Sequence, residues 1–290
     1  MLSYRHGFHA GGWADVHKHV AFMLLLSHLR QKPAAFSVVD AFSGDAIYDL
    51  TGPDAIKTRE FETGIARIWD AADAPPGVDV YLAAVWAANH GGVPAVYPGS
   101  PALARALLRN DDRLVLNELH PTAYRALADW AGDDPRIAVH RRDAIELMGA
   151  LVTPQLRRGV VLIDPAYEVK SEYETIPASV ARAVKAWPQG CFALWYPVLA
   201  EARHRDLLTS LYRALTDTDR MNALVAELTP STRAIGSRRG MRGAGLVIIN
   251  PPWRFDDDMA NAGIWLADRL WHPEMGRHLL CPFADYEGAR

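Results

Sequence analysis

The sequence contains few cysteines and no long apolar run. Its two cysteines, Cys191 and Cys281, lie ninety residues apart and form no C-x-x-C pattern. They therefore indicate neither a disulfide framework nor a thiolate zinc site, as is typical of proteins in the reducing cytosol. The apolar run at 20–26 is far shorter than the ~20 residues of a membrane span, and the first residues lack the apolar core of a signal peptide. We expect a cytoplasmic protein with no membrane partner.

An excess of positive charge is also missing. The 290 residues include 31 Lys and Arg against 34 Asp and Glu, which gives a formal net charge of −3. This balance excludes a protein that coats nucleic acid through bulk charge, but it allows a local basic patch. With 50% hydrophobic and 22% charged residues, the composition is that of a soluble globular protein. The length lets one large domain bury a full core without disulfides or metal.

Predicted strands and helices alternate along most of the chain. The predicted strands are 36–40, 113–118, 137–140, 159–164, 191–196, 223–229 and 245–250. The predicted helices of this pattern are 15–31, 102–109, 124–130, 144–151, 173–187 and 204–215. Apolar residues recur every three or four positions in 15–31, which predicts an amphipathic helix. The alternation predicts an α/β fold with a mostly parallel sheet and helices on both faces.

The segment 47–95 differs from this pattern. It is helix-like at 58–69 and 80–88, and Pro- and Gly-containing turns at 73–77 and 89–92 interrupt it. We interpret 47–95 as a small helical insertion within a single domain that spans 1–290.

Acidic residues follow several predicted strands, at the sheet edge where ligands of open α/β sheets bind. Asp40 opens the turn D-A-F-S-G-D-A at 40–46, which is similar to D-x-F-x-G-x-G, the first motif of class I methyltransferases, except that Ala46 replaces the last glycine. Glu118 follows Asp40 by 78 residues, and removing the insertion of about 50 brings this gap near the ~20 usual in dinucleotide folds. A carboxylate there can bind both ribose hydroxyls of an adenosine.

Asp143, followed by Ala144, closes the third of these strands and is suited to accept a hydrogen bond from an adenine amine. Each acid alone is as well explained by a helix cap or a solvated turn. Three acids after three consecutive strands favour a pocket for S-adenosylmethionine.

The tetrapeptide Asp164-Pro165-Ala166-Tyr167 follows the fourth strand and is similar to the D-P-P-Y or N-P-P-Y motif of methyltransferases that act on exocyclic amines. An adenine N6 amine is a poor nucleophile because its lone pair is delocalised into the ring. A carboxylate and a backbone carbonyl that accept its two N–H groups favour attack on a methyl group. Asp164 is the predicted acceptor and proton sink, Pro165 positions the carbonyl, and Tyr167 stacks on an extruded base.

A second candidate, Asn250-Pro251-Pro252-Trp253, is closer to that motif letter by letter and differs from N-P-P-Y only at its last residue. It closes the last predicted strand, however, whereas Asp164 lies 21 residues after Asp143, one strand–helix unit further on. The order favours Asp164, and we interpret 250–253 as a turn with a packing Trp.

The N-terminus is rich in histidine, with His6, His9, His17 and His19 near Arg5 and Lys18. His17 and His19 would lie ~200° apart on a helix and could not share an ion. No cysteine or local carboxylate set completes a site, so we expect no metal and favour a substrate or cofactor contact surface. A second basic segment, the Gly/Arg loop at 236–243, is suited to binding phosphates but is equally explained as a solvated loop.

Seven segments together resemble the RlmJ family, bacterial adenine-N6 methyltransferases of 23S ribosomal RNA. They are Y-R-H-G-F-H-A-G at 4–11, A-D-V-H-K-H at 14–19, Y-P-G-S-P at 97–101, E-L-H-P at 118–121, L-I-D-P at 162–165, L-W-Y-P at 194–197 and N-P-P-W at 250–253. The similarity covers nearly the whole chain, so it implies a class I methyltransferase fold, a monomer and 23S rRNA as partner before subunit assembly is complete.

The resemblance also implies roles for individual residues. It places in the S-adenosylmethionine pocket His19, Phe42, Ser100, Glu118, Asp143, Ala144 and Asp164. Tyr4, His6 and Lys18 would act beside Asp164 on the RNA, with Tyr4 near the substrate base. Three positions depart from the family pattern: Phe42 replaces a common histidine, Ala144 a glycine and Ala166 a proline.

Two alternatives stay open at this point. A DNA adenine-N6 methyltransferase would carry the same Asp164 motif, although the length leaves no separate target-recognition domain. A catalytically silent RNA-binding module would explain the departures at Ala46, Ala144 and Ala166.

Overall fold

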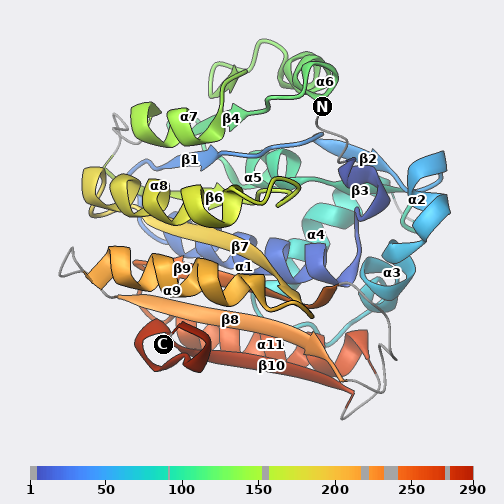
Figure 1. The fold of residues 1–290 in the computed structure, drawn as a ribbon. Helices are drawn as coiled ribbons and strands as arrows, with labels where there is room; N and C mark the ends of the chain where they lie inside the picture. Colours follow the sequence, from blue (N-terminus) through green and yellow to red (C-terminus); the bar gives the residue numbers. More distant parts are fainter. Residues whose placement is uncertain are drawn as a thin grey trace.

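A mixed sheet of eight strands runs through the computed structural model, which describes residues 5–90, 92–151, 157–216, 222–231, 241–271 and 275–289 (Figure 1). The strand order is β10-β8-β9-β7-β6-β1-β4-β5. The strands are β1 (Ser37–Asp40), β4 (Arg113–Asn117), β5 (Ile137–His140), β6 (Gly159–Ile163), β7 (Cys191–Leu199), β8 (Ala223–Pro230), β9 (Met241–Ile249) and β10 (Gly276–Pro282).

The five strands β5, β4, β1, β6 and β7 are parallel, and β9, β8 and β10 extend the sheet in antiparallel pairs. The predicted mostly parallel α/β sheet is confirmed. From β1 the chain continues to β4 and β5 on one side and then to β6 and β7 on the other. The strand order therefore reverses at β1, and in open α/β sheets ligands bind beyond the carboxyl ends of the strands at such a point.

Helices cover both faces of the sheet (Figure 1). One face carries α1 (Trp13–Arg30), α4 (Val78–Asn89), α5 (Ser100–Leu107), α6 (Pro121–Ala131) and α11 (Phe255–Leu270), and the other carries α7 (Ala144–Leu151), α8 (Glu172–Ala186) and α9 (Arg203–Thr216). Alternate strand residues supply the two cores: Val38 packs toward the first group and Val39 toward the second. This follows from the two-residue period of a strand.

Helix α1 is buried on nearly all sides because the sheet, α4, α5 and α11 surround it. The predicted helix is confirmed, but the expected amphipathic character is wrong. Its buried residues include Asp15, His17, Lys18 and His19, each at most 4% exposed. Buried charges are costly unless they are paired, so this helix must find partners for them inside the fold.

Between β1 and β4 the chain forms a two-stranded antiparallel sheet, β2 (Ile47–Asp49) and β3 (Val96–Pro98), and a set of short helices. These are α2 (Pro53–Thr58), η2 (Glu60–Thr63), α3 (Ile65–Ile68) and the longer α4. The predicted helix at 80–88 is confirmed as part of α4, but the predicted continuous helix at 58–69 is wrong. Arg59 has a left-handed φ of 54°, and a Cβ at Gly64 would lie 2.1 Å from the carbonyl oxygen of Gly11.

The turn at 250–253 lies at the opposite edge of the sheet from the parallel strands' carboxyl ends, because β9 is antiparallel to β7. The side-chain amide of Asn250 donates to the carbonyl oxygens of Pro188 (3.1 Å) and Gly190 (2.9 Å). The expected packing role of Trp253 is wrong, since this residue is 88% exposed.

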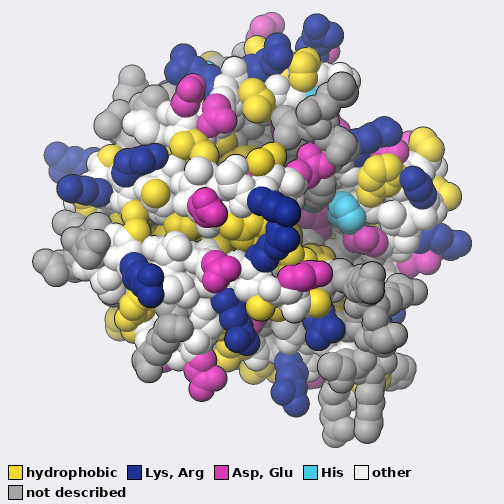
Figure 2. Space-filling view, in the orientation of Figure 1, with side chains coloured by type: hydrophobic (Ala, Val, Ile, Leu, Met, Phe, Trp, Pro, Cys, Tyr) yellow, Lys and Arg dark blue, Asp and Glu magenta, His cyan; other side chains and the backbone are white. Residues whose placement is uncertain are grey.

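Three further features bear on the expectations from sequence. None of the helices in the described ranges is long and apolar enough to cross a membrane. The part of the Gly/Arg loop at 236–240 lies outside the described residues, and β9 begins at Met241. Basic and acidic side chains are interspersed over the face that α8 and α9 cover, in keeping with the near-balanced charge (Figure 2).

Helix α11, which the sequence patterns did not predict, offers a test of the core. Leu266 is fully buried in it, whereas Ile264 is 58% exposed. We expect Leu266→Ala to lower the free energy of unfolding by about 2–5 kcal/mol, because it leaves a cavity. Ile264→Ala on the same helix should change it by less than about 0.5 kcal/mol. Urea unfolding measures both, and equal effects would contradict the described packing.

Candidate active site

A cavity of about 1040 Å³ opens at the carboxyl ends of the parallel strands. Its walls include the segments that follow β1, β4, β5 and β6, together with residues of α1 and η1 (His6–Phe8). Small-molecule pockets usually measure about 300–1,000 Å³. The cavity is therefore large enough for a nucleoside cofactor and a second flat group.

The turn after β1 is held in place from two directions. The backbone N–H of Gly44 donates to Oε2 of Glu118 at 2.9 Å, and that of Asp45 donates to the Tyr48 hydroxyl at 2.9 Å. Gly44 has a φ of +60°, and a Cβ there would lie 2.5 Å from the Tyr48 hydroxyl oxygen. A glycine is therefore required here both for conformation and for space.

Asn117, at the end of β4, connects the turns that follow three strands. Its side-chain amide nitrogen donates to the carbonyl oxygens of Ala41 and Arg142, both at 3.1 Å, and its amide oxygen accepts the Arg142 N–H at 3.0 Å. Asn117 is 1% exposed. These bonds fix the relative positions of the segments that carry Phe42, Glu118 and Asp143.

Asp143 lines the cavity and also caps α7. Its Oδ1 accepts the backbone N–H groups of Ile145 at 2.8 Å and Glu146 at 3.3 Å. Asp143 is therefore a helix cap, as one of the two explanations from the sequence states, and it also lines the cavity.

Asp40, which ends β1, is buried and accepts a hydrogen bond from the Ser100 hydroxyl at 2.6 Å. Ser100 begins α5, so this bond joins β1 to the helix that follows β3. Burial raises the pKa of Asp40 to about 7, and the negative charge of Asp164 adds to this effect.

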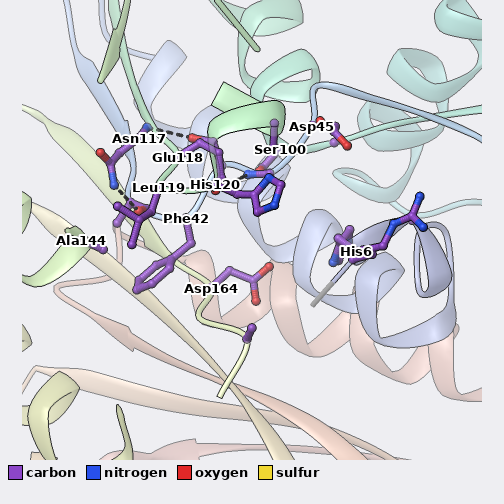
Figure 3. Close-up of a pocket in the computed structure, with 18 of the residues that line it drawn as sticks. His6, Phe42, Asp45, Ser100, Asn117, Glu118, Leu119, His120, Ala144 and Asp164 are labelled. Atoms are coloured by element: carbon purple, nitrogen blue, oxygen red, sulfur yellow. Dashed lines mark hydrogen bonds between the residues drawn. The ribbon is translucent and has the colours of Figure 1, made fainter. Parts of the chain in front are cut away.

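Lys18 forms the central ion pairs of the site. Its Nζ donates to Oδ1 of Asp15 at 2.7 Å and to Oδ2 of Asp164 at 2.5 Å. His6 Nε2 lies 2.8 Å from Oδ2 of Asp15, which also accepts the Gly11 N–H at 3.2 Å. Asp164 projects into the cavity between Phe42 and His6 (Figure 3).

The pKa values in this cluster follow from burial and charge. Burial by itself would lower the pKa of Lys18, but Asp15 and Asp164 raise it above the ordinary value. Burial would likewise raise the pKa of Asp15, but His6 and Lys18 hold it well below the usual range. At neutral pH, Lys18 is therefore a cation between two carboxylates.

His19 and His17 point to different surroundings, as their helical positions predict. The His19 Nδ1 lies 2.8 Å from the Tyr97 hydroxyl, and burial holds the pKa of this imidazole well below its usual value. The His17 ring lies 5.7 Å from the His278 ring, on the side of α11 and β10. Within the described ranges, no three His, Cys, Asp or Glu side chains form a group that could hold a metal.

Among the charged side chains of the cavity lining, acidic ones outnumber basic ones. Its basic residues are Arg5, Lys18 and Arg142. Its acidic residues are Asp45, Asp49, Asp54, Glu118, Asp143, Asp164 and Glu172. Such a lining favours a cationic ligand and repels phosphate groups.

Most of the residues singled out from the sequence meet at this cavity. Its lining includes His6, Lys18, His19, Phe42, Ser100, Glu118, Asp143, Ala144 and Asp164. Tyr4 lies outside the described residues.

Pro165 and Tyr167 do not contribute to the described lining. The Tyr167 hydroxyl donates to the Trp195 carbonyl oxygen at 2.8 Å, and its ring packs 4.6 Å from the Tyr173 ring. Tyr167 has a left-handed φ of 52°, which turns the chain away after Asp164.

Three residues whose hydrogen bonds hold the site in place were not singled out from the sequence: Asp15, Tyr48 and Asn117. The three-residue spacing of Asp15 and Lys18 on one helix was an available signal for the first. Tyr48 and Asn117 gave none, because their partners are distant in the sequence.

The strand reversal at β1, the glycine turn after it, and the acids after the following strands define a class I methyltransferase. A family model described as "Ribosomal RNA large subunit methyltransferase D, RlmJ" matches residues 33–280. The chain is 37% identical over 270 residues to ribosomal RNA large subunit methyltransferase J of Escherichia coli, with 93% of this chain and 94% of that protein covered. The chain belongs to the RlmJ family, and this family implies S-adenosylmethionine as methyl donor.

Two further relatives agree. The Haemophilus influenzae protein of the same name is 38% identical over 260 residues, with 89% of this chain and 90% of that protein covered. The crystal structure of protein LPL1258 of Legionella pneumophila superposes with a TM-score of 0.85 at 31% identity, with 94% of this chain and 98% of that chain covered.

The glycine turn provides a test of the cavity wall. Gly44→Ala should weaken S-adenosylmethionine binding roughly 10-fold, because about 1–2 kcal/mol of backbone strain adds to the clash with Tyr48. Gly132→Ala is the matched control, since Gly132 has a φ of +57° but nothing lies within 4 Å of its added Cβ. Titration calorimetry measures both, and unchanged affinity in Gly44→Ala would contradict this account.

Asp40 provides a pH test. Its folded pKa of about 7 lies above the ordinary 3.8, so between these values the folded protein holds a proton that the unfolded chain releases. The stability that Asp40 contributes is present below pH 3.8 and is lost as the pH rises to about 7. The free energy of unfolding of Asp40→Asn relative to the parent should therefore rise across this window, by at most about 1.4 kcal/mol per pH unit.

The control for this test is Asp112→Asn. Asp112 is buried at the opposite sheet edge, and hydrogen bonds with Arg109 hold its pKa below the usual value in spite of burial. The difference in free energy of unfolding between Asp112→Asn and the parent should not change from about pH 5 to pH 7. A flat difference for Asp40→Asn as well would show that Asp40 is ionised throughout.

Proposed function

We propose that the protein transfers the methyl group of S-adenosylmethionine to the N6 amine of an adenine in 23S ribosomal RNA. The observation that carries this proposal is Asp164. It follows β6 in an Asp-Pro-Ala-Tyr segment, projects into the cavity, and is held there by Lys18. A carboxylate so placed suits an exocyclic amine, which needs an acceptor for its N–H groups while it acts as a nucleophile.

The residues of the cavity suit the proposed cofactor. When bound, S-adenosylmethionine supplies an electrophilic methyl group on a sulfonium centre. The acidic lining favours its positive charges, and Glu118 is suited to bind the ribose hydroxyls. Phe42 and Ala144 offer apolar surface for the adenine, while Asp143 is suited to accept from its amine. His19 and Ser100 complete the proposed cofactor-binding set.

The proposed chemistry rests on positioning and charge. Lys18 occupies Oδ2 of Asp164, which leaves Oδ1 to accept an N–H of the substrate amine. The backbone carbonyl at Pro165 is proposed to accept the other N–H. As the new N–C bond forms, positive charge develops on N6, and the Asp164 carboxylate stabilises it and then takes the released proton. These steps need no metal ion.

We assign His6, Lys18 and Tyr4 to the substrate side of the site. His6 lines the cavity beside Lys18, and Arg5, the neighbour of Tyr4 in the chain, lines it as well. Tyr4 would contact the target base. The Tyr167 ring packs on Tyr173, and its hydroxyl donates to the Trp195 carbonyl oxygen. Through these contacts Tyr167 would fix the segment after Asp164 in the position that the target base needs.

The charge of the cavity bears on how RNA approaches. Phosphates are repelled by the acidic lining, so the target base must leave its stack and enter alone. Unpaired or partly assembled rRNA exposes such a base at lower cost than a finished subunit. We propose that the protein acts as a monomer, in the cytoplasm where rRNA is assembled.

Methyl transfer tests the proposal directly. Purified protein and labelled S-adenosylmethionine are incubated with protein-free 23S rRNA, with assembled large subunits and with duplex DNA. We expect N6-methyladenosine, identified by mass spectrometry of RNA digests, in the protein-free rRNA. Transfer to duplex DNA alone would identify a DNA methyltransferase, and RNA binding without cofactor binding would identify a silent module.

Substitution of the two candidate motifs provides the sharpest comparison. Asp164→Ala should lower kcat roughly 100-fold or more, because both charge stabilisation and proton acceptance are lost. Asn250→Ala should leave kcat unchanged, since Asn250 lies at the other edge of the sheet, although the loss of its bonds to Pro188 and Gly190 will cost some stability. Single-turnover kinetics well below the unfolding temperature measure both. Retained turnover in Asp164→Ala would sink the assignment.

A further inference from the structure

Asp15 is a buried carboxylate that touches two residues of the cavity wall without being part of that wall. It is 4% exposed, and the described lining includes His6 and Lys18 but not Asp15. Its two oxygens are fully used: Oδ1 accepts from Lys18 at 2.7 Å, and Oδ2 binds His6 Nε2 at 2.8 Å and the Gly11 N–H at 3.2 Å.

These bonds fix the positions of two side chains that come from different elements. Lys18 lies on α1 three residues after Asp15, whereas His6 belongs to η1, ahead of the helix. The Gly11 N–H ties the intervening loop to the same carboxylate. Asp15 is thus the shared hydrogen-bond partner of two side chains that line the cavity, His6 and Lys18.

The charges of the cluster give Asp15 a second effect. The charged groups that meet Lys18 are Asp15 from its own helix and Asp164 from β6. With Asp15 present, the ammonium group is shared between two carboxylates. Without it, the buried ammonium would pair with Asp164 alone and would draw more electron density from the carboxylate that the substrate amine needs.

We propose that Asp15 is a positioning residue for methyl transfer: it holds His6 and Lys18 in place and keeps Lys18 from fully neutralising Asp164. This inference rests on the proposed function, because it concerns the rate of the same reaction. Asp15 acts through its partners and touches neither cofactor nor substrate.

The first test separates turnover from cofactor binding. Asp15→Asn keeps the shape but removes the charge, and we expect kcat to fall roughly 10- to 100-fold, the scale of a small misplacement of catalytic groups. The Kd for S-adenosylmethionine should change less than about 2-fold, since Asp15 does not line the cavity. A general loss of stability would instead change both values or neither.

Asp112→Asn is the matched control. Asp112 is fully buried and accepts the backbone N–H groups of Phe36 at 3.0 Å and Arg109 at 2.8 Å, but it lies outside the cavity lining. It should lose stability while kcat stays unchanged below the unfolding temperature. A fall in kcat equal to that of Asp15→Asn would overturn the inference.

A double-mutant cycle tests whether Asp15 acts through Lys18. Lys18→Gln alone should lower kcat, and adding Asp15→Asn to it should cause a smaller further loss than Asp15→Asn causes in the parent, because the contact with Lys18 is already gone and only the contact with His6 remains to be lost. The double variant removes both of the charges that α1 buries at these two positions, so its folding does not depend on an ion pair of Lys18. If Asp15→Asn does not fold, kcat of the double variant should lie less than about 10-fold below that of Lys18→Gln, and a loss as large as or larger than about 100-fold overturns the inference.

The parent protein separates the two hypotheses. If it methylates no RNA, the proposed function is wrong and this inference falls with it. If it methylates rRNA and Asp15→Asn does so at the same rate, the inference alone is overturned.

Discussion

The ion pairs of Lys18 are the interaction on which this structure most depends. Helix α1 is enclosed by the sheet and three other helices, so each charge it carries has to be compensated inside the protein. Asp15 compensates Lys18 from the same helix, and Asp164 compensates it from the end of β6. The position of α1 against the sheet and the position of Asp164 in the cavity are therefore fixed by the same contact. Helix α1 and the segment that follows β6 therefore cannot move independently.

The segment between β1 and β4 builds the other side of the cavity. Tyr48, on the first strand of its small sheet, accepts the N–H of Asp45 and leaves no room for a side chain at Gly44. Ser100, just after its last strand, donates to Asp40. The glycine turn is therefore held by a residue near the beginning of this segment, Tyr48, and by one near its end, Ser100.

The electrostatics of the cavity also clarify the net charge of −3. The acidic side chains of the walls suit a sulfonium-bearing cofactor and repel phosphates, so in the proposed reaction the RNA would be bound at the rim while a single base enters. Such an enzyme gains little from overall positive charge. On the face that carries α8 and α9, basic and acidic side chains are interspersed (Figure 2).

Local patterns in the sequence were enough to predict the α/β class, the parallel strands and the acids that follow them, because strand periodicity and strand-end position are local properties. The sequence also selected Asp164 over Asn250 from motif order. Only the tertiary structure gave the physical reason, which is that an antiparallel β9 carries Asn250 to the opposite edge. It alone revealed that α1 is buried on nearly all sides, that Asp15 joins His6 to Lys18, and that Tyr167 lies outside the described cavity lining. These features depend on contacts between segments far apart in the chain, and no local pattern of residues encodes them.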